Sequence, residues 1–128
     1  MNACGLAWAR AMTFAAIFLD DERDPADVTW LALPKADFVI VRDYESFCAH
    51  IVRHGIPSFI AFDNDLGDGI PEGRDCAKWL VERVLDGEAE FPSDFQFEVH
   101  SKNPPAAQFI RQYLNSFLQS MDHPNFAR

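Results

Sequence analysis

The sequence predicts an α/β domain in which a parallel sheet of about four strands lies between two layers of helices. Short, continuous apolar runs recur along the chain, which is typical of strands buried on both faces. Segments with helical periodicity alternate with these runs, as crossover helices do in parallel sheets. The chain has 128 residues, of which 48% are hydrophobic, so it is long enough for one domain with a substantial core.

Four apolar runs mark the strands. They cover residues 14–19, 38–42, 58–62 and 95–99. Right-handed crossovers limit the possible topologies. We expect the flavodoxin-like strand order 2-1-3-4, which places the first and third strands side by side. Sites in such sheets lie outside the carboxyl ends of the strands, at the point where the strand order reverses.

Three longer segments predict helices. They cover residues 44–54, 75–86 and 104–121. Asp43 and Asp75 are suitable N-caps, and Asn103 followed by Pro104 is a strong helix start. Residues 27–33 predict one or two further helical turns that Pro34 ends, and we assign Trp30 to the core.

The predicted domain covers residues 13–128. Residues 1–12 are expected to form a disordered extension, and Met12, two residues before the first strand, is an alternative start of the protein. The apolar run that follows Arg10 is too short for a membrane span and leads directly into an acidic loop.

Composition limits the class of partner. The net charge is −9 and the pI is near 4.7, which argues against an extended grip on the phosphate backbone of DNA or RNA. A bound metal ion could still supply local positive charge for a small phosphate ligand. The three cysteines follow no metal-ligand spacing, and no apolar stretch is long enough to span a membrane, so we expect a cytoplasmic protein without a membrane partner.

Acidic residues follow the first and third strands directly. Asp20 and Asp21 end one apolar run, and Asp63 and Asp65 follow another. Adjacent strands lie about 4.8 Å apart, so these carboxylates should meet. Clustered carboxylates repel one another unless a cation lies among them, and Mg²⁺ or Mn²⁺ prefers such oxygen ligands. We therefore predict a metal site here; the sequence leaves open whether Asp20 or Asp21 faces inward.

The fourth strand ends in His100 and Ser101, which alternation sends to opposite faces. One of the two is expected to point at the acids. His100 is the candidate general acid or base, with Asp63 and Asp65 as further catalytic candidates. Ser101 is a candidate phosphate ligand or a turn cap, and Asn103 precedes a helix N-terminus suited to anions.

Two basic residues lie close to these motifs. Arg23, within the acidic loop, could clamp a phosphate or form a salt bridge to Asp20 or Asp24. Lys102 could balance phosphate charge or be solvated. Together with Ser101 and Asn103 they form the predicted substrate-binding set.

Four segments occur in an order and spacing similar to those of a known family. They are Phe18-Leu19-Asp20-Asp21-Glu22-Arg23-x-Pro25, Ile60-Ala61-Phe62-Asp63-Asn64-Asp65-Leu66-Gly67, Cys76-Ala77-Lys78-Trp79-Leu80 and His100-Ser101-x-Asn103-Pro104. With these motifs the chain resembles the cyclic-phosphate processing receiver-like domains, small bacterial and phage proteins derived from the response-regulator receiver fold. The resemblance implies a three-layer flavodoxin/receiver-like sandwich and the processing of a cyclic phosphate, on a nucleotide or an RNA end.

The sequence also departs from these relatives. Asn64 stands where many members of the family have histidine, which predicts weaker or altered activity if that histidine takes part in the chemistry. Compared with true receivers, the chain lacks a counterpart of the fifth strand and its phosphate-binding lysine.

The leading hypothesis is metal-dependent hydrolysis or transfer of a small cyclic or terminal phosphate. Asp20, Asp21, Asp63 and Asp65 would hold Mg²⁺ or Mn²⁺. A phospho-accepting receiver with Asp63 as acceptor is one alternative. A non-catalytic module that binds a phosphorylated ligand or a protein is the other.

Overall fold

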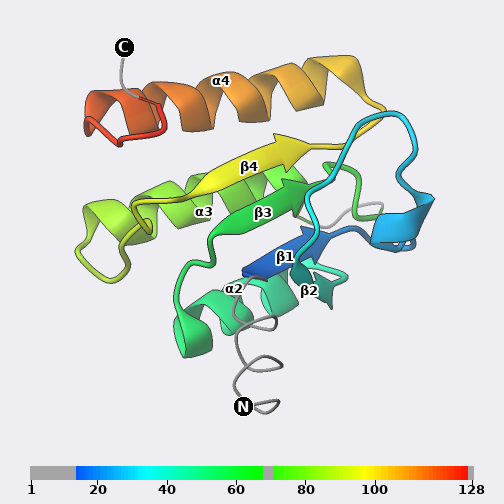
Figure 1. Cartoon of the computed structure of the whole chain (residues 1–128), viewed down its shortest axis with the longest axis horizontal. Helices are drawn as coiled ribbons and strands as arrows, with labels where there is room; N and C mark the ends of the chain where they lie inside the picture. The colour runs from blue at the N-terminus through cyan, green and yellow to red at the C-terminus, as the bar shows by residue number, and fades with distance from the viewer. Residues whose placement is uncertain (1–13, 68–70, 127–128) are drawn as a thin grey trace, which may run out of the picture.

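The computed structural model of the chain describes residues 14–67 and 71–126 (Figure 1). Its centre is a four-stranded sheet in which every neighbouring pair is parallel. The strands are β1 (Ala15–Leu19), β2 (Asp37–Val41), β3 (Phe59–Phe62) and β4 (Gln96–Val99). Their order is β2-β1-β3-β4. This arrangement confirms the predicted fold class and strand order.

Three helices cover one face of the sheet. They are α2 (Tyr44–His54), α3 (Gly73–Leu85) and α4 (Pro104–Ser120). Alternate residues of β1 and β3 point into the core beneath these helices, where Leu19 and Phe62 are fully buried. The helices bury Phe47, Leu80 and Leu114 against them.

The opposite face is covered without a regular helix. The short 3-10 helix η1 (Pro25–Asp27) begins this segment, which then runs irregularly to β2 and contributes Val28 to a second apolar cluster with Phe18 and Phe59. The predicted helical turns over residues 27–33 are therefore wrong. Asp24 and Asp27 form a capping box around Pro25, and the backbone at Val28 is already extended.

Two helix boundaries illustrate what local residues determine. Asp43 accepts a hydrogen bond from the Ser46 amide at 2.8 Å and caps α2, and Gly55 (φ 81°) ends the helix, as predicted. Helix α3 instead begins before Asp75, because Glu72 is its N-cap and Asp75 closes a capping box onto Glu72.

The sheet ends at β4 without a fifth strand among the described residues. Side chains form hydrogen bonds with backbone groups on this outer edge instead. Asn125 donates to the Phe95 carbonyl at 3.0 Å, Arg111 donates to the Val99 carbonyl at 2.9 Å, and the Val99 amide donates to Glu98 at 3.1 Å. These contacts supply hydrogen bonds that a fifth strand would otherwise provide.

The expected N-terminal extension, residues 1–12, lies outside the described residues, as does the alternative start at Met12. None of the helices in the described ranges is long and apolar enough to cross a membrane.

Candidate functional site

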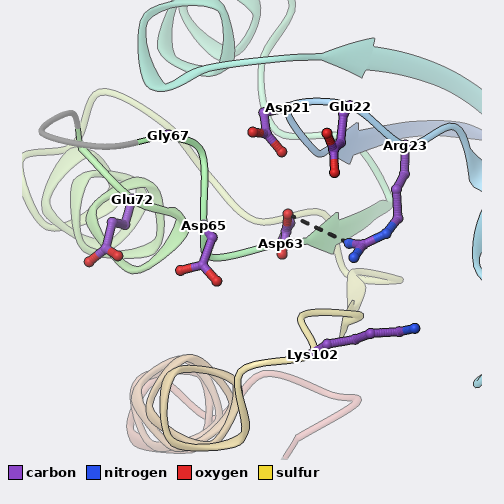
Figure 2. A pocket seen from close by; sticks show the side chains of 8 residues that line it. All are labelled: Asp21, Glu22, Arg23, Asp63, Asp65, Gly67, Glu72 and Lys102. Carbon is purple, nitrogen blue, oxygen red and sulfur yellow. Dashed lines mark ion pairs between the residues drawn. The ribbon is translucent and has the colours of Figure 1, made fainter.

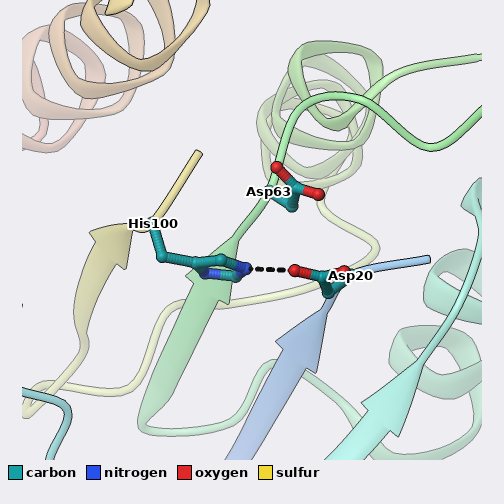
Figure 3. A group of neighbouring side chains, drawn as sticks. All are labelled: Asp20, Asp63 and His100. Atoms are coloured by element: carbon teal, nitrogen blue, oxygen red, sulfur yellow. Dashed lines mark hydrogen bonds and ion pairs between the residues drawn. The ribbon is translucent and has the colours of Figure 1, made fainter. Parts of the chain in front are cut away.

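Three buried polar side chains meet where β1, β3 and β4 end (Figure 3). Asp20, Asp63 and His100 each follow the last residue of a strand, and all three are buried. Their ligand atoms lie within 4.8 Å of one another, so the three groups could share one ion. The predicted juxtaposition of the strand ends is present.

Asp20 is saturated with hydrogen bonds. Its Oδ1 atom accepts the backbone amides of Glu22 at 3.0 Å and Arg23 at 2.8 Å. Its Oδ2 atom contacts Nε2 of His100 at 3.0 Å and NH1 of Arg23 at 3.2 Å. Burial raises the pKa of Asp20, but the hydrogen bonds from His100 and the two amides outweigh burial and hold this pKa well below its usual range.

His100 is held from two sides. Its ring stacks on Phe18 with centroids 4.6 Å apart and planes 6° apart. Since an ionised carboxylate can only accept, the bond to Asp20 places a proton on Nε2 of His100. Its Nδ1 atom is buried and has no hydrogen-bond partner in the described part of the chain.

Asp63 lies between these two residues, at the end of β3. Its Oδ1 atom accepts the Asn64 amide at 2.8 Å, and its Oδ2 atom lies 3.9 Å from NH1 of Arg23. Burial, followed by the nearby charge of Asp20, raises the pKa of Asp63 to about 6. This carboxylate carries fewer contacts than Asp20 and lies closer to solvent.

An open, polar pocket of about 370 Å³ lies over Asp63 (Figure 2). Five carboxylates, two cations and one glycine line it. These residues are Asp21, Glu22, Arg23, Asp63, Asp65, Gly67, Glu72 and Lys102. Figure 2 shows Arg23 and Lys102 on one side of Asp63, and Asp65 and Glu72 on the other. Asp21 and Glu22 lie above Asp63, with Glu22 next to Arg23. The two cations thus lie together on the basic side of the pocket, opposite the acidic side that Asp65 and Glu72 form.

The pocket contains some of the predicted metal and catalytic residues and excludes others. Asp21, Asp63 and Asp65 line it. Asp20 does not line the pocket and bonds His100 instead, so Asp21 is the acid of this pair that faces the pocket. His100 is buried against Phe18 and does not line the pocket.

Of the four predicted phosphate-binding residues, two line the pocket and two do not. Arg23 forms the expected salt bridge to Asp20 and also lines the pocket, and its binding of a phosphate stays a prediction. Lys102 lines the pocket. Ser101 and Asn103 do not: the Ser101 hydroxyl accepts the Asn103 amide at 3.1 Å, and Asn103 caps α4 through the Ala106 amide at 3.3 Å.

Comparison with known proteins assigns the family. The cyclic-phosphate processing receiver domain matches residues 15–116, from β1 to the last turns of α4. The chain belongs to this family. No curated protein and no solved structure matches it.

Trp30 is a component of this receiver domain's site that the sequence did not reveal. Its Nε1 atom donates to the His100 carbonyl at 3.0 Å. The Arg23 guanidinium lies 5.2 Å from the centroid of the indole ring, and the Lys102 ammonium lies 4.1 Å from it. Trp30 is 38% exposed, so its assignment to the core is wrong.

Two further residues shape the acidic side of the pocket. Asn64 donates to Glu72 at 3.2 Å and to Asp65 at 3.3 Å, and it accepts the Arg74 amide at 3.2 Å. Glu72, which the sequence did not suggest, joins the lining through the N-cap of α3. Asn64 thus ties the end of β3 to the start of α3.

Gly73 allows α3 to start so close to the site. Its amide donates to the Asn64 carbonyl at 2.8 Å. A Cβ at this position would lie 1.7 Å from the Asp63 carbonyl oxygen, well inside any allowed contact. A side chain at Gly73 would therefore displace the backbone that carries Asp63.

The chemistry of the lining carboxylates suits a hard divalent cation, although among the described residues the group whose ligand atoms lie within 4.8 Å of one another is Asp20, Asp63 and His100. Asp21 and Asp65 present exposed carboxylates in the pocket, and Asp63 has an oxygen whose only close ion contact is the long one to Arg23. Oxygen ligands of this type suit Mg²⁺ or Mn²⁺. Asp20 fits less well, because four contacts already occupy the roughly four acceptor sites of a carboxylate.

Proposed function

We propose that this receiver domain is a metal-dependent enzyme that opens a small cyclic phosphate by hydrolysis. The observation that carries the proposal is the divided pocket: carboxylates that suit a divalent cation face two cations that suit a phosphate, across a space of about 370 Å³. Membership in a cyclic-phosphate processing family agrees with this chemistry.

Asp21, Asp63 and Asp65 would hold Mg²⁺ or Mn²⁺ in this proposal. When bound, such an ion polarises the phosphoryl group and lowers the pKa of a bound water. Asp20 acts differently: its saturated carboxylate fixes the amides of Glu22 and Arg23, and so shapes the loop that presents Asp21 and Arg23.

Arg23 and Lys102 would bind the non-bridging oxygens of the phosphate. Arg23 can do so with a guanidinium that Asp20 already orients from behind. Trp30 lies against both cations and restricts the directions in which they can move. The basic side of the pocket is thereby preorganised for an anion.

Hydrolysis of a cyclic diester forms one bond between water and phosphorus and breaks one ester P–O bond. Asp65, an exposed carboxylate of the lining, would accept the proton that the attacking water loses. The leaving oxygen would take a proton from solvent, which reaches the open pocket. His100 acts as a positioning residue, because it holds Asp20 and is buried away from the pocket.

The test is turnover of a 2′,3′-cyclic nucleotide by the purified chain with Mg²⁺ or Mn²⁺. We expect hydrolysis by the wild-type protein, and loss of turnover by at least about 10²-fold in Asp63→Ala. Glu90→Gln is the matched control, because this exposed carboxylate lies outside the pocket. Equal rates in wild type and Asp63→Ala would contradict the proposal.

A phospho-accepting receiver is the second candidate, favoured by the position of Asp63 at the end of β3 inside the pocket. It predicts that incubation with a small phosphodonor and Mg²⁺ adds one phosphoryl group to Asp63, measured by mass spectrometry. A binding module instead predicts that the cyclic nucleotide raises Tm without turnover.

A further inference from the structure

The two edges of the sheet differ in how they meet solvent. Asn125, Arg111 and Glu98 occupy backbone groups along the outer edge of β4. The β2 edge has apolar side chains at its surface instead: Val39 is 43% exposed and Ile40 is 38% exposed. An edge strand with free backbone groups is a template for pairing with another strand, and proteins usually protect such edges.

The backbone of β2 has free groups on this edge. The Asp37 amide donates to the Phe14 carbonyl at 2.9 Å, and the Val41 carbonyl accepts the Asp20 amide at 3.1 Å. Alternation along a strand then directs the amides and carbonyls of Phe38 and Ile40 away from β1. Within residues 14–67 and 71–126, these outward groups have no hydrogen-bond partner.

We propose that the β2 edge is a self-association surface on which a second copy of this chain pairs in antiparallel fashion. The two-fold axis passes through Val39, so Phe38 of each copy faces Ile40 of the other. Directly opposed residues of this kind exchange both of their backbone hydrogen bonds, and the outward groups of Phe38 and Ile40 are the ones that such a pairing uses. The product is one continuous eight-stranded sheet.

Charge and backbone hydrogen bonding favour this register over its two neighbours. With the axis at Val39, Lys35 of each copy lies opposite Asp43 of the other, and Lys35 has no ion pair in the described part of the chain. An axis at Ile40 would place Asp37 opposite Asp43, which is repulsive. An axis at Phe38 would place Arg42 opposite Pro34, which has no amide to donate.

The pairing is compatible with access to the site. Because the two copies run antiparallel, the carboxyl ends of their strands point in opposite directions. The two acidic pockets therefore lie at opposite ends of the strands of the joined sheet. The interface is one short strand from each copy, so it is expected to be weak, with dissociation in the range of about 10 μM to 1 mM. The inference does not depend on the proposed catalytic function.

Sedimentation velocity of the full chain over this concentration range tests the proposal. We expect the mass to rise from the 14.5 kDa of one chain toward twice that value. Val39→Lys is expected to weaken association at least tenfold, because it places two lysines against each other at the axis. Lys35→Asp is expected to weaken it several-fold by opposing Asp43.

Ile40→Pro tests the backbone contacts separately, because it removes an outward amide and no hydrogen bond to β1. Leu85→Lys is the matched control: Leu85 is 69% exposed on α3, and its replacement should leave association unchanged. Far-UV circular dichroism confirms that each variant folds. A wild-type chain that stays monomeric at 1 mM, or a dimer that persists in Val39→Lys and is lost in Leu85→Lys, would overturn the proposal.

Discussion

Nε2 of His100 lies 3.0 Å from Oδ2 of Asp20, and this buried hydrogen bond joins the ends of β4 and β1 across the end of β3. Asp63 follows β3 and therefore lies beside the pair, where the negative charge of Asp20 acts on it. The bond thus links the loop that carries Asp21 and Arg23 to the segment after β4 that carries Lys102. The two cations of the pocket therefore depend on it.

Replacement of His100 should destabilise the fold. His100→Phe keeps an aromatic ring against Phe18 but removes one hydrogen bond from a buried carboxylate, which typically costs about 1–3 kcal/mol. Urea unfolding at pH 7 measures the loss. His54→Phe is the control, because His54 is exposed and far from the strand ends. Equal unfolding midpoints for wild type and His100→Phe would show that the bond adds no stability.

The same pair predicts how stability responds to acid. The folded-state pKa of Asp20 lies below its usual value of 3.8, so its contribution is present above pH 3.8 and is lost as the pH falls below that value. Because His100 is one of the groups that lower this pKa, His100→Phe should lose less stability than wild type between pH 4 and pH 2.

Asp63→Asn should stabilise the metal-free protein at neutral and alkaline pH. The pKa of Asp63 is raised from 3.8 to about 6, so ionisation of Asp63 costs folding free energy. That cost is absent below pH 3.8, grows between pH 4 and 6, and is complete above pH 6. We expect Asp63→Asn to be more stable than wild type by about 1–3 kcal/mol at pH 8, with no difference near pH 4.

Unfolding in EDTA at several pH values measures this gain. Addition of Mg²⁺ should reverse the ranking, because the ion would stabilise wild type and leave Asp63→Asn largely unaffected. If Asp63→Asn is less stable than wild type at pH 8 in EDTA, the ionised carboxylate of Asp63 does not lower the folding stability.

Phosphate should bind only after the metal. Five carboxylates and two cations line the pocket, so the lining repels an anion when no cation is present. Isothermal titration with inorganic phosphate should show no binding in EDTA and measurable binding with Mg²⁺ or Mn²⁺. Glu90→Gln should behave as wild type, since Glu90 lies outside the pocket. Phosphate binding of equal strength in EDTA would mean that Arg23 and Lys102 suffice.

Trp30 should affect substrate binding more than the chemical step. Trp30→Leu removes the ring that lies against Arg23 and Lys102, so we expect KM for the cyclic nucleotide to rise about 5- to 30-fold, with a smaller change in kcat. Trp30→Phe keeps a ring but loses the bond to the His100 carbonyl, so its KM should lie between those of wild type and Trp30→Leu. Phe109→Leu, on α4, is the control. A fall in kcat at unchanged KM would contradict a role in positioning the cations.

Most of the fold follows from local signals. Each strand is a short apolar run, and Asp43 and Asn103 cap their helices as predicted. The strand order is the flavodoxin-like order expected from the alternation of strands and helices. The predictions failed where two local signals competed. The segment after η1 has enough apolar residues for a helical turn, yet Val28 is already extended and packs on Phe18 and Phe59 instead.

By itself the sequence determined which residue types gather at the site, because strand ends in a parallel sheet meet at one edge. Only the tertiary structure decided which of them face the pocket. Neighbouring residues on a strand end point to opposite sides, and their pattern does not say which side helices cover. Contacts between distant parts of the chain decide this orientation. Asp20 bonds His100 in the interior while Asp21 lines the pocket, and Arg23 and Lys102 pack against the ring of Trp30.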